Sequence, residues 1–353
     1  MLPSLFLSSY LASFVVTNAM AAPAKEPRRV ALVVGIGSFE KLPAELARDA
    51  PRSDAARVAA ALETQGTYAR VRLLTDASAT RANIASVLRN QIATEVGPND
   101  TFLLYFASHG IGADFGEPRL LTYESDPEDL TATSLSVAEF AAQVKDVVHA
   151  GHTIILTDAA FEGQLNGLAL LGPTANDWPD LGATSFVMSS AAPRQTAGVG
   201  VFARAIIEGL QGRADTNVDR KVTSGELSRW MVLAVPDVTG GKQFPTVQSS
   251  YDPDLVVAVA PAPDAGQPRA QIDKAKFVFT GVSDPVVDCG GQRVACDPAC
   301  YTWDFTAGAC TLSGAVDGTE RTGSVEVRYR GAYTCAPFQG GLECSSPPPP
   351  RGP

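Results

Sequence analysis

The chain has 353 residues, of which 45% are hydrophobic and 19% are charged, and its formal net charge is −10. The hydrophobic fraction excludes a wholly disordered chain, and the length predicts about two domains. An acidic chain is not attracted to a phosphate backbone, so nucleic acid is excluded as an expected partner. Repeated apolar stretches of about 18 residues are missing, so no stable membrane insertion is expected.

The N-terminal segment has the pattern of an export signal. Residues 5–16 are mostly apolar and precede Ala19-Met20-Ala21, a small-x-small sequence typical of signal-peptide cleavage sites. We therefore expect residues 1–21 to be a signal peptide and the protein to be secreted or periplasmic. No lysine or arginine precedes Lys25, so an uncleaved anchor or a wrongly assigned start codon stays an open alternative.

Short apolar runs alternate with stretches of helical periodicity between residues 28 and 259. Strands are predicted at residues 30–34, 71–74, 102–107, 152–157 and 184–189, and helices at residues 52–63, 80–93, 136–148, 202–211 and 224–233. Alternating strands and helices predict an α/β fold with a mostly parallel sheet flanked by helices on both faces.

The last quarter of the chain differs in composition. Residues 260–269 are rich in proline and predict a linker, residues 270–345 predict a small β-rich module, and residues 346–353 form a proline-rich tail. Turns are expected at the pairs Gly290-Gly291 and Asp317-Gly318. All the cysteines lie in this module, which has no histidine, so disulfides are favoured over zinc, with the pairing left open among Cys289, Cys296, Cys300, Cys310, Cys335 and Cys344.

Candidate site residues follow two neighbouring strands. Ligands of such sheets bind at the carboxyl ends of the strands, where Ser108-His109-Gly110 follows the third predicted strand and Asp158-Ala159-Ala160 the fourth. We expect the ring of His109 to be exposed in the crevice, with a backbone N–H close by. The alternative is a strand-end histidine whose ring is satisfied by local hydrogen bonds.

The order of strand, Ser-His-Gly, strand and Asp-Ala-x-Phe-x-Gly resembles the caspase and metacaspase group, especially its bacterial members. Ala31–Ile36, Asp54-Ala55 and Gly200–Phe202 agree with it, and the resemblance covers residues 28–259. In that family, a histidine assists a cysteine thiolate, and backbone N–H groups stabilise the oxyanion. The resemblance implies that His109 is the assisting histidine and that the backbone N–H of Gly110 helps to stabilise the oxyanion.

The same resemblance places Ala160 where the family has its cysteine. Alanine has no nucleophilic atom, and residues 1–288 contain no cysteine. The resemblance therefore implies an inactive pseudo-peptidase that acts in binding or regulation, either natural or made by an engineered Cys-to-Ala change. The alternatives are a cysteine endopeptidase that cleaves after Arg or Lys, in which Ala160 is an engineered or atypical replacement, and a structural protein. Ser108, Ser189 and Ser190 are the nearest hydroxyls, but they lack a Gly-x-Ser-x-Gly elbow.

Two acidic residues complete the implied site. In the metacaspase-like branch, an aspartate two residues before the cysteine helps to form an acidic pocket for Arg or Lys. Asp158 holds that position, and Asp54 resembles the second acidic contributor. The implied partner is a peptide or protein with basic residues, which two carboxylates would attract. The alternative is that Asp158 caps the loop that follows it.

Residues 215–226 have the ligand spacing of a calcium-binding EF-hand loop. Arg220 replaces the glycine of the sharp turn and must adopt a left-handed conformation, at a cost of about 1–2 kcal/mol. No cofactor is certain, and calcium is the one candidate, against a helix–turn–helix without metal. The oxygen ligands would be Asp215, Asn217, Asp219, Lys221, Thr223 and Glu226.

Overall fold

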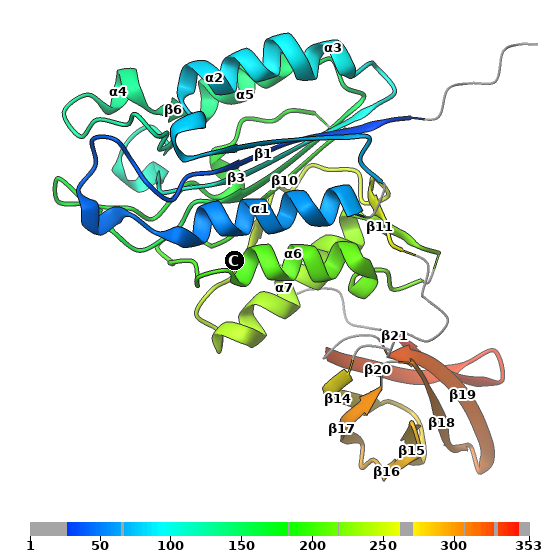
Figure 1. The fold of residues 1–353 in the computed structure, drawn as a ribbon. Coiled ribbons are helices and arrows are strands. Elements are labelled where there is room, and N and C mark those ends of the chain that lie inside the picture. The colour runs from blue at the N-terminus through cyan, green and yellow to red at the C-terminus, as the bar shows by residue number, and fades with distance from the viewer. Residues whose placement is uncertain are drawn as a thin grey trace, which may run out of the picture.

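The computed structural model describes residues 27–64, 67–182, 184–217, 219–261, 271–306, 308–327 and 331–345. The predicted signal peptide at residues 1–21 and the tail at residues 346–353 lie outside the described residues, as do residues 262–269 of the predicted linker and residue 270. The described residues form an α/β unit, coloured blue to yellow in Figure 1, and a β-rich unit, coloured yellow to red.

A six-stranded sheet in the order β12-β10-β7-β3-β1-β2 forms the centre of the α/β unit. The strands are β1 (Arg29–Gly35), β2 (Arg70–Thr75), β3 (Thr101–Ala107), β7 (His152–Asp158), β10 (Ser185–Ser189) and β12 (Thr246–Val247). All neighbours are parallel except β12, which is antiparallel to β10. Strands β1 and β3 are almost continuous apolar runs because both of their faces are buried. The predicted parallel sheet is confirmed.

Helices cover both faces of this sheet, as Figure 1 shows. One face carries α1 (Asp49–Thr64), α6 (Val201–Glu208) and α7 (Ser224–Thr239), and the other carries α2 (Arg81–Val87), α3 (Ala93–Glu95) and α5 (Val137–Val147). A π-helical turn over Leu88–Ile92 joins α2 to α3. Within the described residues, no helix is both long enough and apolar enough to cross a bilayer.

Short elements surround the edge of the sheet at which β3 and β7 end. A three-stranded sheet is formed by β4 (Gly110–Ile111), β5 (Arg119–Leu120) and β6 (Leu135–Ser136), while β8 (Gln164–Leu165) and β9 (Leu168–Ala169) form a hairpin. Other short elements include α4 (Leu130–Thr133) and the strands β11 (Lys221–Thr223) and β13 (Val256–Val259), which pair with each other.

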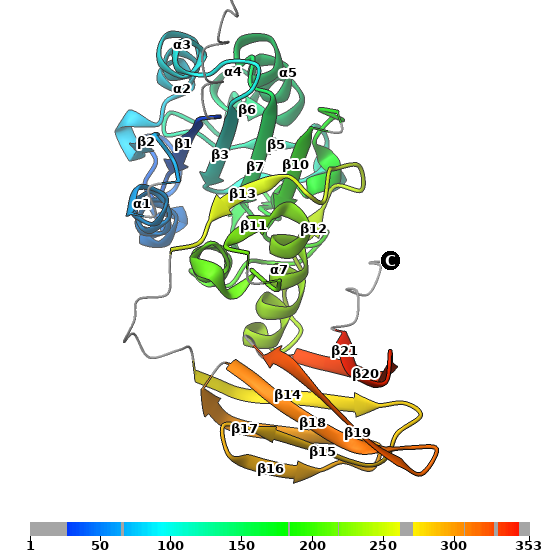
Figure 2. The same cartoon turned by 90° about the vertical axis from the view of Figure 1, so that its right-hand side faces the viewer.

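The C-terminal unit is an eight-stranded sheet in the order β16-β15-β18-β19-β21-β20-β14-β17, whose strands are labelled in Figure 2. Its strands are β14 (Gln271–Phe279), β15 (Ser283–Cys289), β16 (Gln292–Ala295), β17 (Ala299–Thr306), β18 (Gly308–Val316), β19 (Thr319–Val327), β20 (Gly331–Phe338) and β21 (Gly341–Ser345). The predicted pair Gly290-Gly291 forms the turn of the β15–β16 hairpin, and Asp317-Gly318 forms that of the β18–β19 hairpin. All of these turn residues have positive φ.

Three disulfides join the cysteines of this unit: Cys289–Cys310, Cys296–Cys300 and Cys335–Cys344. The first and third pairs connect neighbouring strands, and five of these cysteines are buried in the apolar core of the unit. Both parts of the predicted fold class are confirmed: an α/β unit with a mostly parallel sheet, followed by a β-rich unit with disulfides.

Removal of Cys289–Cys310 is expected to destabilise the C-terminal unit. This disulfide closes a loop with a sequence separation of 21, whereas Cys296–Cys300 has a separation of 4. A disulfide that closes a loop of about the longer length stabilises the folded state by about 3 kcal/mol, because it restricts the conformations of the unfolded chain. Urea unfolding of the Cys289→Ser/Cys310→Ser variant should show that loss, and a Cys296→Ser/Cys300→Ser variant should lose less. Equal midpoints for the parent and both variants would contradict this expectation.

Candidate functional site

The ends of β3 and β7 bring His109 and Ala160 together. An isolated antiparallel β-bridge pairs these two residues. The N–H of Ser108 donates to the carbonyl oxygen of Asp158 at 3.2 Å, and the N–H of Ala197 donates to that of Ala160 at 2.7 Å. The two segments that the sequence singled out therefore meet at one edge of the sheet.

The ring of His109 is buried, with 1% of the residue exposed. Its Nε2 lies 2.9 Å from the carbonyl oxygen of Leu46, and its Nδ1 lies 3.2 Å from that of Phe161. Burial lowers the pKa of His109, although both carbonyls act against this. A neutral imidazole has one N–H, so only one of the two carbonyls accepts a hydrogen bond at a time.

The expectation of an exposed ring is wrong because residues distant in the sequence cover His109. The ring of Phe39 lies 5.9 Å from the histidine ring and that of Phe161 lies 6.3 Å away, measured between centroids. The surrounding apolar cluster includes residues of the 44–46 turn and of the β8–β9 hairpin, namely Leu42, Leu46, Ile111, Leu121, Leu165 and Leu170. The geometry corresponds to the alternative, a ring held by local carbonyls.

Gly110 occupies a position that only glycine fits. A Cβ built there would lie 2.7 Å from Cδ of Pro173 and 3.1 Å from the carbonyl oxygen of Arg119. This close approach accounts for the glycine through packing alone, so its role as an oxyanion donor stays a prediction.

The nearby serine hydroxyls are buried. Oγ of Ser108 donates to the carbonyl oxygen of Leu121 at 2.8 Å, and Oγ of Ser189 lies 2.6 Å from Oγ1 of Thr157. These two hydroxyls are therefore engaged in the interior. Ser190 is also buried, at the end of β10.

Asp54 and Asp158 belong to one buried acidic cluster together with Tyr105 and Ser190. Burial raises the pKa of Asp158 to about 7, the nearby Ser190 hydroxyl opposes this rise, and the charge of Asp54 adds to it. Burial also raises the pKa of Tyr105 well above its usual value, and the charges of Asp158 and Asp54 act in the same direction. The structure thus brings the two predicted acids close enough to interact.

The Asp158 carboxyl is poorly provided with hydrogen bonds. Among the described residues, neither of its oxygens has a partner of ordinary hydrogen-bond geometry, and the same holds for the hydroxyls of Tyr105 and Ser190. No backbone N–H within the described residues bonds to this side chain, so the loop-capping alternative lacks its hydrogen bond. A buried carboxylate whose nearby donors are poorly placed hydroxyls is costly to ionise, which is why this group favours its protonated form.

Arg57 is a member of the site that the sequence analysis missed. Its Nη2 donates to Oδ1 of Asp54 within α1. The signal was present in the sequence, since oppositely charged residues three positions apart on a helix face each other.

An open cavity of about 390 Å³ lies beside the loop that follows Ala160. Its lining carries two cations and one acid, and it includes neither Asp54 nor Asp158. The expected acidic crevice is therefore divided: the acids are buried, and the open space beside them is lined by Arg48, Phe161, Glu162, Thr196, Ala197, Gly198, Val199, Thr239, Lys242 and Gln243.

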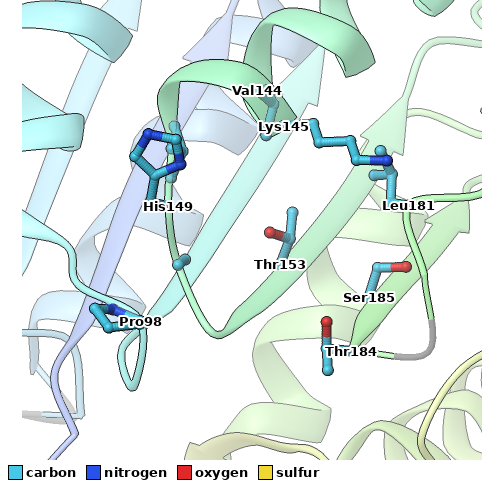
Figure 3. A pocket seen from close by; sticks show the side chains of 10 residues that line it. Pro98, Val144, Lys145, His149, Thr153, Leu181, Thr184 and Ser185 are labelled. Atoms are coloured by element: carbon cyan, nitrogen blue, oxygen red, sulfur yellow. The ribbon is translucent and has the colours of Figure 1, made fainter.

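A second cavity, of about 280 Å³, lies at the opposite edge, where β7 and β10 begin. Figure 3 shows Lys145, His149, Thr153 and Ser185 among the residues that line this cavity. His149 is exposed in the segment that precedes β7.

The 215–226 loop is held by its own backbone. The Arg220 N–H donates to Oδ2 of Asp215 at 3.0 Å, and Arg220 has a φ of 68°, the left-handed conformation expected from the sequence. The Glu226 carboxylate accepts from the N–H groups of Thr216 and Thr223. The Glu226 N–H in turn donates to Oγ1 of Thr223, and these two reciprocal Thr223–Glu226 bonds form a capping box at the start of α7. Calcium binding by this loop stays a prediction.

Comparisons with known proteins place the α/β unit in a family. A Geobacter sulfurreducens protein of known structure matches with 15% identity and a TM-score of 0.47, over 66% of this chain and 100% of that one. Caspase-1 from Spodoptera frugiperda matches with 16% identity and a TM-score of 0.44, over 68% and 92% respectively. No curated protein matches. The family model for the caspase domain matches residues 28–256, so the chain belongs to the caspase domain family.

Proposed function

We propose that this chain is an exported caspase-fold protein that binds a peptide or protein segment with a basic side chain and does not cleave it. The observation that supports this most directly is Ala160, which lies against His109 at the position where the family sequence order has its nucleophile. A methyl group cannot form a covalent acyl intermediate. The cysteines of the chain are all paired in disulfides of the C-terminal unit.

The buried acids support a basic ligand group. Asp54 and Asp158 are close enough for one charge to act on the other, and the only donors near the Asp158 carboxyl among the described residues are the hydroxyls of Ser190 and Tyr105, which are poorly placed for hydrogen bonds. A guanidinium or ammonium group beside Asp158 would supply charged donors and would favour the ionised carboxylate.

The disulfides support export. Disulfides persist in oxidising compartments such as the periplasm and the extracellular space. Three of them in one short unit agree with the signal-peptide pattern at residues 1–21, which lie outside the described residues.

A second candidate is a ligand with an acidic group, and the lining of the open cavity favours it. Arg48 and Lys242 face the same space as Glu162, so the lining has an excess of one positive charge. An acidic side chain there would be attracted by both cations.

Peptide binding distinguishes these candidates. Fluorescently labelled peptides of equal length that end in Arg, Lys, Asp or norleucine amide are titrated with the protein, and the anisotropy is measured. We expect the Arg and Lys peptides to bind and the norleucine peptide not to bind. Asp158→Asn should weaken binding about tenfold, the value of one charged hydrogen bond. Asp146→Asn, an exposed change on α5, is the matched control.

Each contrary outcome has a clear meaning. Mass spectrometry should find every peptide intact, and a cleaved Arg or Lys peptide would instead support the endopeptidase alternative. Preferential binding of the Asp peptide would support the second candidate. Binding of no peptide by the folded protein would reject both and leave the structural role.

A further inference from the structure

The side chains of Asp54 and Arg57 form a bonded pair at the boundary between interior and solvent. The Asp54 side chain is 2% exposed, whereas the Arg57 side chain is 52% exposed. Nη2 of Arg57 donates to Oδ1 of Asp54. A buried carboxylate therefore faces a guanidinium whose other side is in water.

The start of α6 leaves room for this guanidinium. Gly200 is the N-cap residue of α6 and has a φ of 69°, a conformation that favours glycine. A Cβ built on Gly200 would lie 3.1 Å from Nη2 of Arg57 and 3.5 Å from Oδ1 of Asp54. Figure 1 shows α1 and α6 side by side, so the pair lies where these helices meet.

The pair also borders the rest of the acidic cluster. The charge of Asp54 raises the pKa of both Tyr105 and Asp158, and the charge of Arg57 lowers that of Tyr105. Oδ1 of Asp54 accepts from Arg57, whereas Oδ2 of Asp54 and both oxygens of Asp158 have no partner within hydrogen-bond distance and angle among the described residues. Arg57 thus supplies the cation that this acidic cluster otherwise lacks.

We propose that Arg57 is a competitor within its own chain: its guanidinium occupies the place beside Asp54 that a basic side chain of a ligand takes, and the ligand binds by displacing it. This inference rests on the proposed function. Displacement requires only that the half-exposed Arg57 side chain swing into water, where its charge stays hydrated. The apparent affinity for the ligand is the intrinsic affinity multiplied by the fraction of molecules in which the place is vacant, so occupation by Arg57 weakens binding.

Chemical rescue tests the place itself without a peptide. Arg57→Ala vacates it, and Arg204→Ala is the matched control because Arg204 pairs with Glu208 on the exposed side of α6. Methylguanidinium chloride at millimolar concentration is the probe, and tetramethylammonium chloride controls for ionic strength. We expect methylguanidinium to raise the melting temperature of Arg57→Ala and to leave the parent and Arg204→Ala unchanged. The absence of a selective rise would overturn the inference.

Peptide affinity tests the competition. The labelled Arg peptide should bind Arg57→Ala about tenfold more tightly than it binds the parent, since one hydrogen bond to a charged group no longer has to be broken. Arg204→Ala should bind it like the parent. If Arg57→Ala does not fold, Arg57→Gln serves in its place, because the amide keeps a donor near Asp54 and lacks the charge.

The two proposals can fail separately. If the parent binds the Arg peptide and the Arg57 variants bind it no better, the competition is wrong and the proposed function stands. If methylguanidinium rescues Arg57→Ala but no form binds any peptide, the place beside Asp54 is established and the proposed function fails.

Discussion

Asp158→Asn is expected to stabilise the protein at about pH 8 and to change its stability little at about pH 4. Folding raises the pKa of Asp158 from 3.8 to about 7. Between these values, the folded protein keeps the proton that the unfolded chain releases, so the free energy of unfolding falls by about 1.4 kcal/mol per pH unit. The contribution of Asp158 is thus fully present below the lower value and is lost as the pH rises through the higher one. Asparagine stays neutral and avoids that loss.

Urea unfolding at several pH values checks this expectation. The advantage of Asp158→Asn over the parent should grow from about pH 4 to about pH 7 and then level off. The Asp146→Asn control should show no such trend. Burial lowers the pKa of His109, so its contribution is present above its usual pKa and is lost as the pH falls. The parent and the variant share this effect, which leaves their difference specific to Asp158. A difference that is constant with pH would contradict the titration of Asp158 in this range.

Ala160→Cys is expected to introduce a thiol that His109 does not activate, and no peptide cleavage. The two nitrogens of His109 face the carbonyl oxygens of Leu46 and Phe161, so neither directs a free lone pair at residue 160. Burial also disfavours the imidazolium form that stabilises a neighbouring thiolate. Residue 160 is buried, and burial raises the pKa of a thiol, so alkylation by iodoacetamide, followed by mass spectrometry, should show half-maximal reactivity at or above about pH 8.5. The parent protein supplies the background, because its cysteines are paired in disulfides.

A second variant isolates the histidine in this experiment. His109→Gln in the Ala160→Cys background should leave the pH profile of alkylation unchanged, because the ring does not act on the thiol. Half-maximal alkylation well below pH 7, lost in the double variant and accompanied by cleavage of Arg or Lys peptides, would contradict this expectation. It would mean that His109 turns toward residue 160 and that the endopeptidase alternative requires only the cysteine.

The central sheet was predictable because its strands are buried on both faces and leave continuous apolar runs. The helix at residues 224–233 was predicted too short: α7 continues to Thr239 although it contains Pro236. Proline at this point removes one hydrogen bond near the end of the helix, which the remaining packing tolerates. Strand β12 was not predicted, because its two residues are too few to show the alternation of polar and apolar side chains that marks a strand.

The candidate site was predicted less completely than the sheet. The strand-end rule correctly brought together the segments of His109 and Ala160, because it depends only on the order of parallel strands. It could not show that Leu46, from another loop, covers the histidine ring. The rule also does not distinguish a carboxylate that lines a cavity from one that is buried. Glu162 lines the open cavity, whereas Asp158 is buried.

The pairing of every cysteine within the C-terminal unit divides the chain into two redox regimes. Reduction of the three disulfides would weaken only the β-rich unit, since residues 1–288 contain no sulfhydryl or disulfide. Thiol-directed oxidants and alkylating agents, which inactivate cysteine peptidases, would find no target in the α/β unit. A ligand of the α/β unit could then be retained while the attached unit changes its stability with the redox state of the surroundings.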